Sequence, residues 1–216
     1  MKVIDLTYDV TDKMLVWPGN QRPIFEWKTR ANSEHVNVTR IDMEAHTGTH
    51  VDSPHHFLMD GATLEQLPLS HFCGRARLFR SRSQPAGQEI TLKEALDAGF
   101  AMEEGGIFVL DTGISAYAER RDYNFLFPVP SFELLDWLIE RKIACYMTDA
   151  TSLDRPADDR TSPRHKRLFS RGIPVVENLR NLDEVPENRD FVICAMPLKL
   201  VGREGSPCRA AALLNI

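Results

Sequence analysis

One short segment of the chain concentrates side chains that can bind metal ions. Five of them fall within eleven residues: His46, His50, Asp52, His55 and His56. Imidazole and carboxylate groups are the ligands that zinc and manganese take at hydrolytic sites. A pair of histidines four residues apart is by itself a weak signal, but this density of ligand-type side chains predicts a metal site.

The spacing within this segment predicts a bend in the backbone. A regular strand rises about 3.3 Å per residue and would separate His46 from His50 by roughly 13 Å, too far to share one ion. Gly48 lies midway between them and can adopt conformations that other residues avoid, and Ser53-Pro54 stops a regular continuation. The alternative, a strand with polar residues facing solvent, leaves the density of ligand side chains unexplained.

A hydrolytic metal site also needs ligands from elsewhere in the chain. The segment 162–177 offers two candidates, His165 on an expected helix and Glu177 at the end of the strand that follows. Each of them also fits a solvated residue on an exposed helix face or at a strand end. From the residues alone, both roles stay open.

The elements that must position these side chains are mostly strands. Helices are expected after the N-cap residues Thr91 and Ser131, and a third from Pro163 to Arg171, with Gly172 just beyond its end. Strands are predicted by short apolar runs rich in β-branched residues, at 3–7, 24–28, 36–43, 76–80, 107–110, 143–147, 174–176, 191–195 and 209–214. The runs 106–110 and 143–147 look buried on both faces. These patterns predict an α/β fold with a mixed, strand-rich sheet.

Composition narrows the class of protein. The 216 residues are 43% hydrophobic and contain no repeat or long linker, so residues 1–216 are expected to form a single domain. The net charge of −5 and the lack of a basic stripe argue against nucleic acid as a partner. Asp5 interrupts the N-terminus, and no run approaches the ~20 apolar residues of a membrane helix, so we expect no membrane partner and a cytoplasmic location.

The four cysteines do not suggest chemistry of their own. They are far apart in the sequence and form no C-x-x-C pair. Free cysteine commonly lies in protein cores, where it behaves as a small apolar residue. We therefore expect buried side chains at Cys73, Cys145, Cys194 and Cys208.

The pattern H-x-G-T-H-x-D-x-P-x-H, which runs from His46 to His56, resembles the signature of the cyclase family that includes bacterial kynurenine formamidase and isatin hydrolase. The similarity extends over nearly the whole chain, through the segments 4–7, 16–19, 197–200 and 205–210 and the pair His165 and Glu177. It implies a single layered β/β/α domain of the swivelling type. It also implies a homo-oligomer, either a dimer or a tetramer.

The resemblance also implies a ligand set for one or two divalent ions, with zinc favoured over manganese. His46, His50 and Asp52 would hold one ion, and His165 would bind a second. Asp52 and Glu177 would bridge the two. A site with one ion, in which Glu177 is only an outer hydrogen-bond partner, stays open.

Two further residues would serve the reaction. By the resemblance, His56 transfers protons, a task suited to a side chain with a pKa of about 6.5. Trp17 would line the substrate pocket, although an aromatic ring packed under the Pro18-Gly19 turn is an equally good reading. Ser53, where the formamidases usually have alanine, and the loop 151–162 are departures that leave the substrate open.

The function predicted from these residues is hydrolysis of a small-molecule amide by metal-activated water. The favoured reaction is that of an arylformamidase, which converts N-formylkynurenine to kynurenine and formate. Hydrolysis of a cyclic amide such as isatin, or of a lactone, is the alternative within enzymes. A structural metal site in a binding protein is the non-enzymatic alternative, but such a site has no need for the additional histidine at position 56.

Overall fold

The computed structural model describes residues 1–81, 87–120, 122–156 and 161–215. Its helices are α1 (Ala31–Glu34), α2 (Leu92–Asp97), α3 (Phe132–Glu140) and α4 (Pro163–Phe169). Its strands are β1 (Lys2–Asp5), β2 (Ile24–Thr29), β3 (Val38–Asp42), β4 (His50–Asp52), β5 (Cys73–Arg80), β6 (Glu89–Ile90), β7 (Ile107–Asp111), β8 (Val129–Pro130), β9 (Cys145–Thr148), β10 (Val175–Glu177), β11 (Asp190–Pro197) and β12 (Gly205–Leu214).

The main sheet closes on itself. Its eight strands follow the order β1-β12-β11-β5-β7-β9-β10-β4, and β4 pairs with β12 as well as with β10. The strands β5, β7, β9 and β10 run parallel to their neighbours in that series, whereas β4, β11, β12 and β1 join antiparallel. The prediction of an α/β fold with a mixed, strand-rich sheet is confirmed, and the closed ring is a feature that strand patterns could not reveal.

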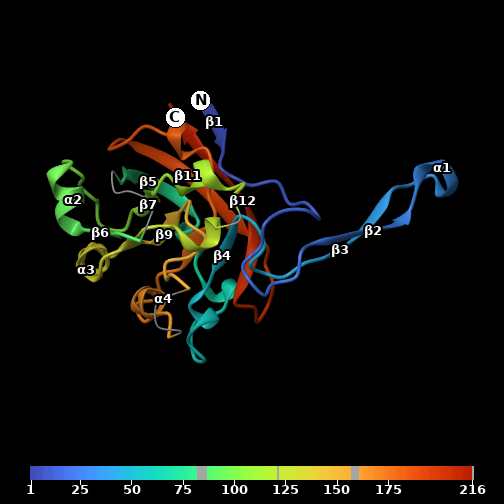
Figure 1. Cartoon of the computed structure of the whole chain (residues 1–216), viewed down its shortest axis with the longest axis horizontal. Coiled ribbons are helices and arrows are strands. Elements are labelled where there is room, and N and C mark those ends of the chain that lie inside the picture. The colour runs from blue at the N-terminus through green and yellow to red at the C-terminus, as the bar shows by residue number, and fades with distance from the viewer. Residues whose placement is uncertain (82–86, 121, 157–160, 216) are drawn as a thin grey trace.

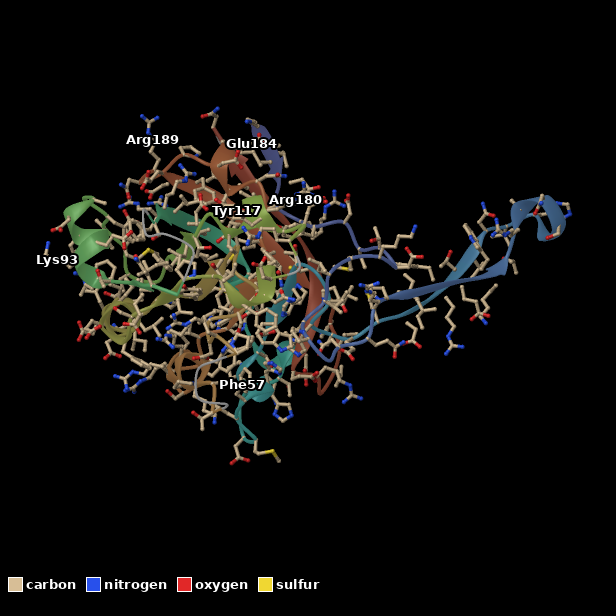
Figure 2. All side chains as sticks on the ribbon, viewed as in Figure 1. Phe57, Lys93, Tyr117, Arg180, Glu184 and Arg189 are labelled. Carbon is tan, nitrogen blue, oxygen red and sulfur yellow. The ribbon has the colours of Figure 1, made fainter. Side chains whose placement is uncertain are left out.

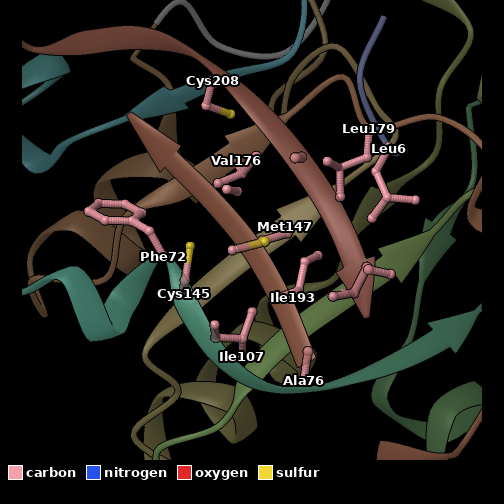
Figure 3. Close-up of a cluster of buried hydrophobic side chains, with 14 of the residues drawn as sticks. Leu6, Phe72, Ala76, Ile107, Cys145, Met147, Val176, Leu179, Ile193 and Cys208 are labelled. Carbon is pink, nitrogen blue, oxygen red and sulfur yellow. The ribbon is translucent and has the colours of Figure 1, made fainter. Parts of the chain in front are cut away.

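Side chains that alternate along the strands fill two separate cores. On β7, Ile107 and Val109 belong to the core inside the ring. Figure 3 shows Ile107 in this core with Met147, Val176 and Ile193. The intervening Phe108 and Leu110 face outward, against the helices. All residues of β7 and β9 are buried, as the continuous apolar runs predicted.

Helices α2, α3 and α4 cover the outer face of the parallel strands (Figure 1). Thr91 Oγ1 accepts a hydrogen bond from Glu94 N at 3.1 Å, and Ser131 Oγ accepts one from Leu134 N at 3.3 Å, so both expected N-caps are present. Replacing such a cap by alanine typically costs about 0.5–2 kcal/mol. Helix α4 ends at Phe169, two residues earlier than predicted.

Several local elements differ from the prediction. Strand β4 and the short pair β6 and β8 were not predicted, because two or three residues carry no periodic signal. The four-residue helix α1 was missed for the same reason. Cys145 and Cys208 are buried as expected, but Cys73 and Cys194 are partly exposed, which corrects that prediction. These two lie opposite each other on the outer-facing part of β5 and β11.

A two-stranded hairpin of β2 and β3 projects far from the body of the molecule (Figure 1). Its side chains extend into solvent along both faces of the ribbon (Figure 2). Nothing else in the described part of the chain pairs with these two strands. Across the described residues, none of the helices is both long enough and apolar enough to traverse a bilayer.

Candidate metal centre

The predicted site is built around β4, which carries His50 and Asp52. This strand lies between β10 and β12, and both side chains are buried. Gly48 has a φ of +62°, a conformation that favours glycine, so the expected bend between His46 and His50 is present. The bend brings the His46 Nδ1 atom to 2.7 Å from Asp52 Oδ1.

Strand β12 makes room for the His46 ring. Gly205 pairs with Asp52 across the β4–β12 ladder. A Cβ atom at Gly205 would lie 2.6 Å from His46 Cε1, closer than real contacts allow. Glycine at position 205 therefore lets the imidazole rest against the sheet and point toward the Asp52 carboxylate.

The two candidates from the distant segment reach the same place. Glu177 ends β10 and lies directly opposite His50 in the β4–β10 register, where His50 Nε2 is 3.6 Å from Glu177 Oε2. His165, on α4, places Nε2 3.0 Å from Glu177 Oε1 and 3.8 Å from Asp52 Oδ2. Helix α4 and strand β10 are joined by a tight turn at Gly172, which folds the helix back over the strand end.

The five side chains form two groups that could each hold a metal ion. One comprises His46, His50 and Asp52, and the other comprises Asp52, His165 and Glu177. In each group the possible ligand atoms lie within 4.8 Å of one another. Asp52 belongs to both groups, as a bridging carboxylate would. The structure thus brings together all five predicted ligands, and their binding of metal remains a prediction.

The electrostatics of this cluster favour a cation. Asp52 and Glu177 are buried, and within the described residues neither forms an ion pair with lysine or arginine. Burial lowers the pKa of His50 and of His165, but the neighbouring carboxylates outweigh it and raise these pKa values to about 9 and about 10. Burial and the Asp52 charge raise the pKa of Glu177. Without lysine or arginine, these buried carboxylates need protonated histidines or a metal ion to balance their charge, and imidazole with carboxylate suits a divalent transition metal.

His56 lies beside the cluster but outside both groups. Its ring stacks on the His46 ring with centroids 4.0 Å apart. Burial lowers the pKa of His56 to about 4, with a further lowering from the nearby histidines, although Asp52 opposes it. The imidazole is therefore neutral at pH 7 and can accept a proton.

The cluster opens into a large cavity of about 1740 Å³. His46, His50, Asp52, His165 and Glu177 line it. His56 and Trp17 line it too, so Trp17 stands where the resemblance places it, and its contact with substrate remains a prediction. The indole also packs against the small apolar cluster around Tyr123 and Phe127, so the two readings of this residue are compatible.

Comparisons with known proteins agree with this geometry. The family described as "Putative cyclase" matches residues 4–155, more than two thirds of the chain. The chain belongs to this cyclase family. It is 32% identical to a protein named kynurenine formamidase from Salinibacter ruber over 212 residues, 97% of this chain and 96% of that protein.

This cyclase-family chain is also similar to solved structures. A structure described as a potential metal-dependent hydrolase with cyclase activity is 30% identical, with a TM-score of 0.81 over 100% of this chain and 98% of the other. Isatin hydrolase A from Labrenzia aggregata has a TM-score of 0.87 over 100% of this chain and 94% of its own, at 23% identity. The latter likeness establishes the shared fold.

The sequence did not single out Asp154, which contacts the candidate ligand His165. Its Oδ2 atom lies 2.7 Å from His165 Nδ1 and also accepts the His165 backbone N–H at 3.1 Å, while Oδ1 accepts the Arg164 N–H at 3.0 Å. The carboxylate thus caps α4 and accepts a hydrogen bond from the Nδ1–H of His165, which turns Nε2 toward Glu177. Metal-binding histidines commonly have such a partner, but several aspartates in this region were equal candidates by sequence.

We expect Asp154→Ala to weaken zinc binding by about 10- to 100-fold, because His165 loses the group that orients its ring. Asp154→Asn, which can still cap the helix, should have a smaller effect. Competition with a chelating dye measures the affinity. Asp136→Asn is a matched control, since Asp136 contacts the same helix only through Arg167 on its surface. Unchanged zinc affinity in Asp154→Ala would contradict this role.

The structure also places two departures from the family pattern, Ser53 and the loop 151–162. Ser53 is fully buried, and its Oγ has no hydrogen-bond partner among the described residues, so the hydroxyl adds nothing that we can assign. The loop 151–162 contributes Asp154, Thr151 and Arg155 to the cavity wall. Its residues 157–160 lie outside the part that the structure describes.

Proposed function

We propose that this chain is a metal-dependent amide hydrolase, an arylformamidase that converts N-formylkynurenine to kynurenine and formate. The observation that carries the proposal is the pair of ligand groups that share Asp52 at the wall of a cavity, with His56 beside them. The 32% identity over almost the full length of a protein named kynurenine formamidase supports the choice of substrate.

The side chains around the cluster suit this reaction. The two ligand groups would hold divalent metal, which would supply a nucleophilic water at neutral pH and polarisation of the amide carbonyl. His56 can accept a proton from the attacking water and pass it to the departing nitrogen. Phe57 lines the same cavity, with its ring 4.2 Å from His56 and 4.8 Å from His165 by centroids, and offers an apolar surface for the aryl ring of a substrate.

Opening of a cyclic amide such as isatin is the second candidate. It is favoured by the high structural similarity to isatin hydrolase A, but at 23% identity that similarity supports only the fold. The formamidase relatives share more of the sequence. We therefore rank the formamide first and the cyclic amide or lactone second.

A metal-reconstituted activity screen tests the proposal. The protein is stripped with a chelator, reloaded with zinc or manganese, and assayed on N-formylkynurenine, isatin and an aryl lactone. We expect turnover of the formamide to be fastest and to need added metal, with zinc as the favoured ion. Faster turnover of isatin would replace the first candidate by the second, and no turnover of any of the three would reject the proposed function.

We also propose a homo-oligomer that is assembled through the hairpin and located in the cytoplasm. Phe25 and Trp27 alternate along β2 and pair with Ile41 and Thr39 on β3, so they share one face. That face is exposed, with Trp27 at 49% and Ile41 at 54%. The other face carries polar pairs such as Glu26 with Arg40. An isolated two-stranded hairpin is marginally stable in water, and a second copy of the chain would cover its apolar face.

We expect Trp27→Glu to shift the wild-type dimer or tetramer toward a monomer, because a charge would be buried at the contact. Size-exclusion chromatography with light scattering measures the mass. Arg40→Glu places a similar change on the opposite face and should leave the mass unaltered. A monomeric wild type, or an equal shift in both variants, would contradict assembly through the apolar face.

A further inference from the structure

We propose that Arg180 binds a carboxylate of the substrate, so that the enzyme prefers aryl amides that carry an acidic side chain. This inference rests on the proposed function and narrows its substrate class. Arg180 follows Glu177 by three residues, and both line the same cavity. Three residues span at most about 11 Å, so the guanidinium is within reach of a small molecule whose amide lies at the metal centre.

The backbone around Arg180 is fixed to the metal-binding segment. The buried Leu179 precedes Arg180, and the Arg180 N–H donates to Leu6 O at 3.1 Å. In the neighbouring segment after β1, Tyr8 N donates to Thr49 Oγ1 at 3.0 Å, and that hydroxyl donates to Asn178 O. Thr49 immediately precedes His50, so the segment bearing Arg180 keeps a constant position relative to the ligand cluster.

The Arg180 guanidinium differs from those of two other arginines that line the cavity, Arg80 and Arg155. Arg80 is held by Asp111 at 2.6 Å and by the Leu182 carbonyl at 2.8 Å. Arg155 donates to the Gly87 carbonyl. In the described parts of the chain, the Arg180 guanidinium has neither a carboxylate nor a carbonyl partner, although the side chain is only partly exposed.

The contact of this guanidinium with the Tyr8 ring leaves its hydrogen-bond donors available. Arg180 Cζ lies 5.2 Å from the centre of the Tyr8 ring. Contact with an aromatic face engages the guanidinium plane, whereas the N–H groups lie at its edge and can form a two-point contact with a carboxylate. Arg180, labelled in Figure 2, is thus a group that can bind an anion and has no carboxylate partner among the described residues.

This placement separates two kinds of aryl amide. A substrate with an acidic side chain can place its amide at the ligand cluster and its carboxylate at Arg180. A neutral aryl formamide or isatin has no group for Arg180 to bind. The structure therefore favours a substrate such as N-formylkynurenine, whose side chain is an amino acid, over a neutral amide.

The test compares two formamides in the wild type and in three variants. N-formylkynurenine carries the carboxylate, and 2-formamidoacetophenone is the same aryl ketone without the amino acid. We expect Arg180→Met to lower the ratio of kcat/KM for the acidic over the neutral substrate by about 10- to 100-fold, mainly through KM, since charged hydrogen bonds are worth that much. Arg180→Lys should restore part of the ratio. Lys13→Met, which removes an exposed cation from the same cavity wall, should leave it unaltered.

Each outcome separates this inference from the proposed function. An unchanged ratio in Arg180→Met, or an equal decrease in Lys13→Met, would overturn the role of Arg180 while the hydrolysis itself stands. If wild type hydrolyses neither formamide, the proposed function fails. Calorimetric binding of kynurenine and 2-aminoacetophenone then decides the anion site: Arg180→Met should weaken only the first, and equal affinities in both proteins would reject it.

Discussion

The Asp52→Ala variant is expected to lose its metal and its hydrolytic activity together. Asp52 is the residue that both ligand groups share, so its removal damages both. Loss of outer-shell partners of metal ligands typically costs 10- to 100-fold in affinity, so loss of the shared ligand should cost more than about 100-fold. Metal content after gel filtration, measured by mass spectrometry, gives the result directly.

Controls distinguish a ligand from a structural residue at this position. Asp52→Asn keeps the size of the side chain and removes its charge, and it should also lose metal. Asp183→Asn, on the same cavity wall but outside the cluster, should keep both metal and activity. A full metal complement in Asp52→Ala would show that the ligand assignment is wrong.

Removal of metal from the wild type with a chelator tests the alternative of a structural metal site. A protein with a catalytic site should stay folded after metal removal, because its two large cores consist of apolar side chains rather than of the candidate ligands. A protein with a structural metal site would lose its cooperative thermal unfolding when the metal is removed by a chelator. Unfolding of the chelated wild type would favour a binding protein over an enzyme.

The second large effect is expected at His56. His56→Ala should lower kcat by about 10²- to 10⁴-fold and keep its metal, since this is the range for removal of general acid–base help. The neutral imidazole, with its pKa lowered to about 4 by burial, stacks on His46 without belonging to either ligand group. Single-turnover kinetics with parallel metal analysis measures both quantities.

The neighbouring histidine is a matched control for this prediction. His55 lies next to His56 on the same short helical turn, Pro54–His56, but outside both ligand groups and the cavity lining. His55→Ala should therefore retain near wild-type kcat. Loss of metal from His56→Ala would make His56 a ligand rather than a proton-transfer residue, and an unchanged kcat would remove it from the reaction.

Local sequence signals predicted the regular part of the fold. The long apolar runs at β7 and β9 and the caps Thr91 and Ser131 carry information within a few residues, and the structure agrees with them. The closure of the sheet depends instead on the pairing of β4 with β12, strands more than 150 residues apart. No local pattern encodes that contact, and β4 is too short to show a period.

The residues of the candidate site likewise differ in whether local sequence signals predict them. Residues 46–56 could be selected from the density of ligand side chains, and the bend at Gly48 follows from strand geometry. His165 and Glu177 required a family resemblance, because each looks ordinary in its own segment. Asp154 and Arg180 could not be selected at all, since their roles depend on which atoms they approach in three dimensions.

The position of β4 in the sheet has a consequence for folding during synthesis. The strand with His50 and Asp52 is inserted between β10 and β12, both made much later in synthesis. The β4–β12 pairing that closes the sheet therefore cannot form until residues 205–207 have left the ribosome. Long-range pairing of this kind also slows folding. The histidines of the early segment therefore remain exposed to solvent until β12 has been synthesised.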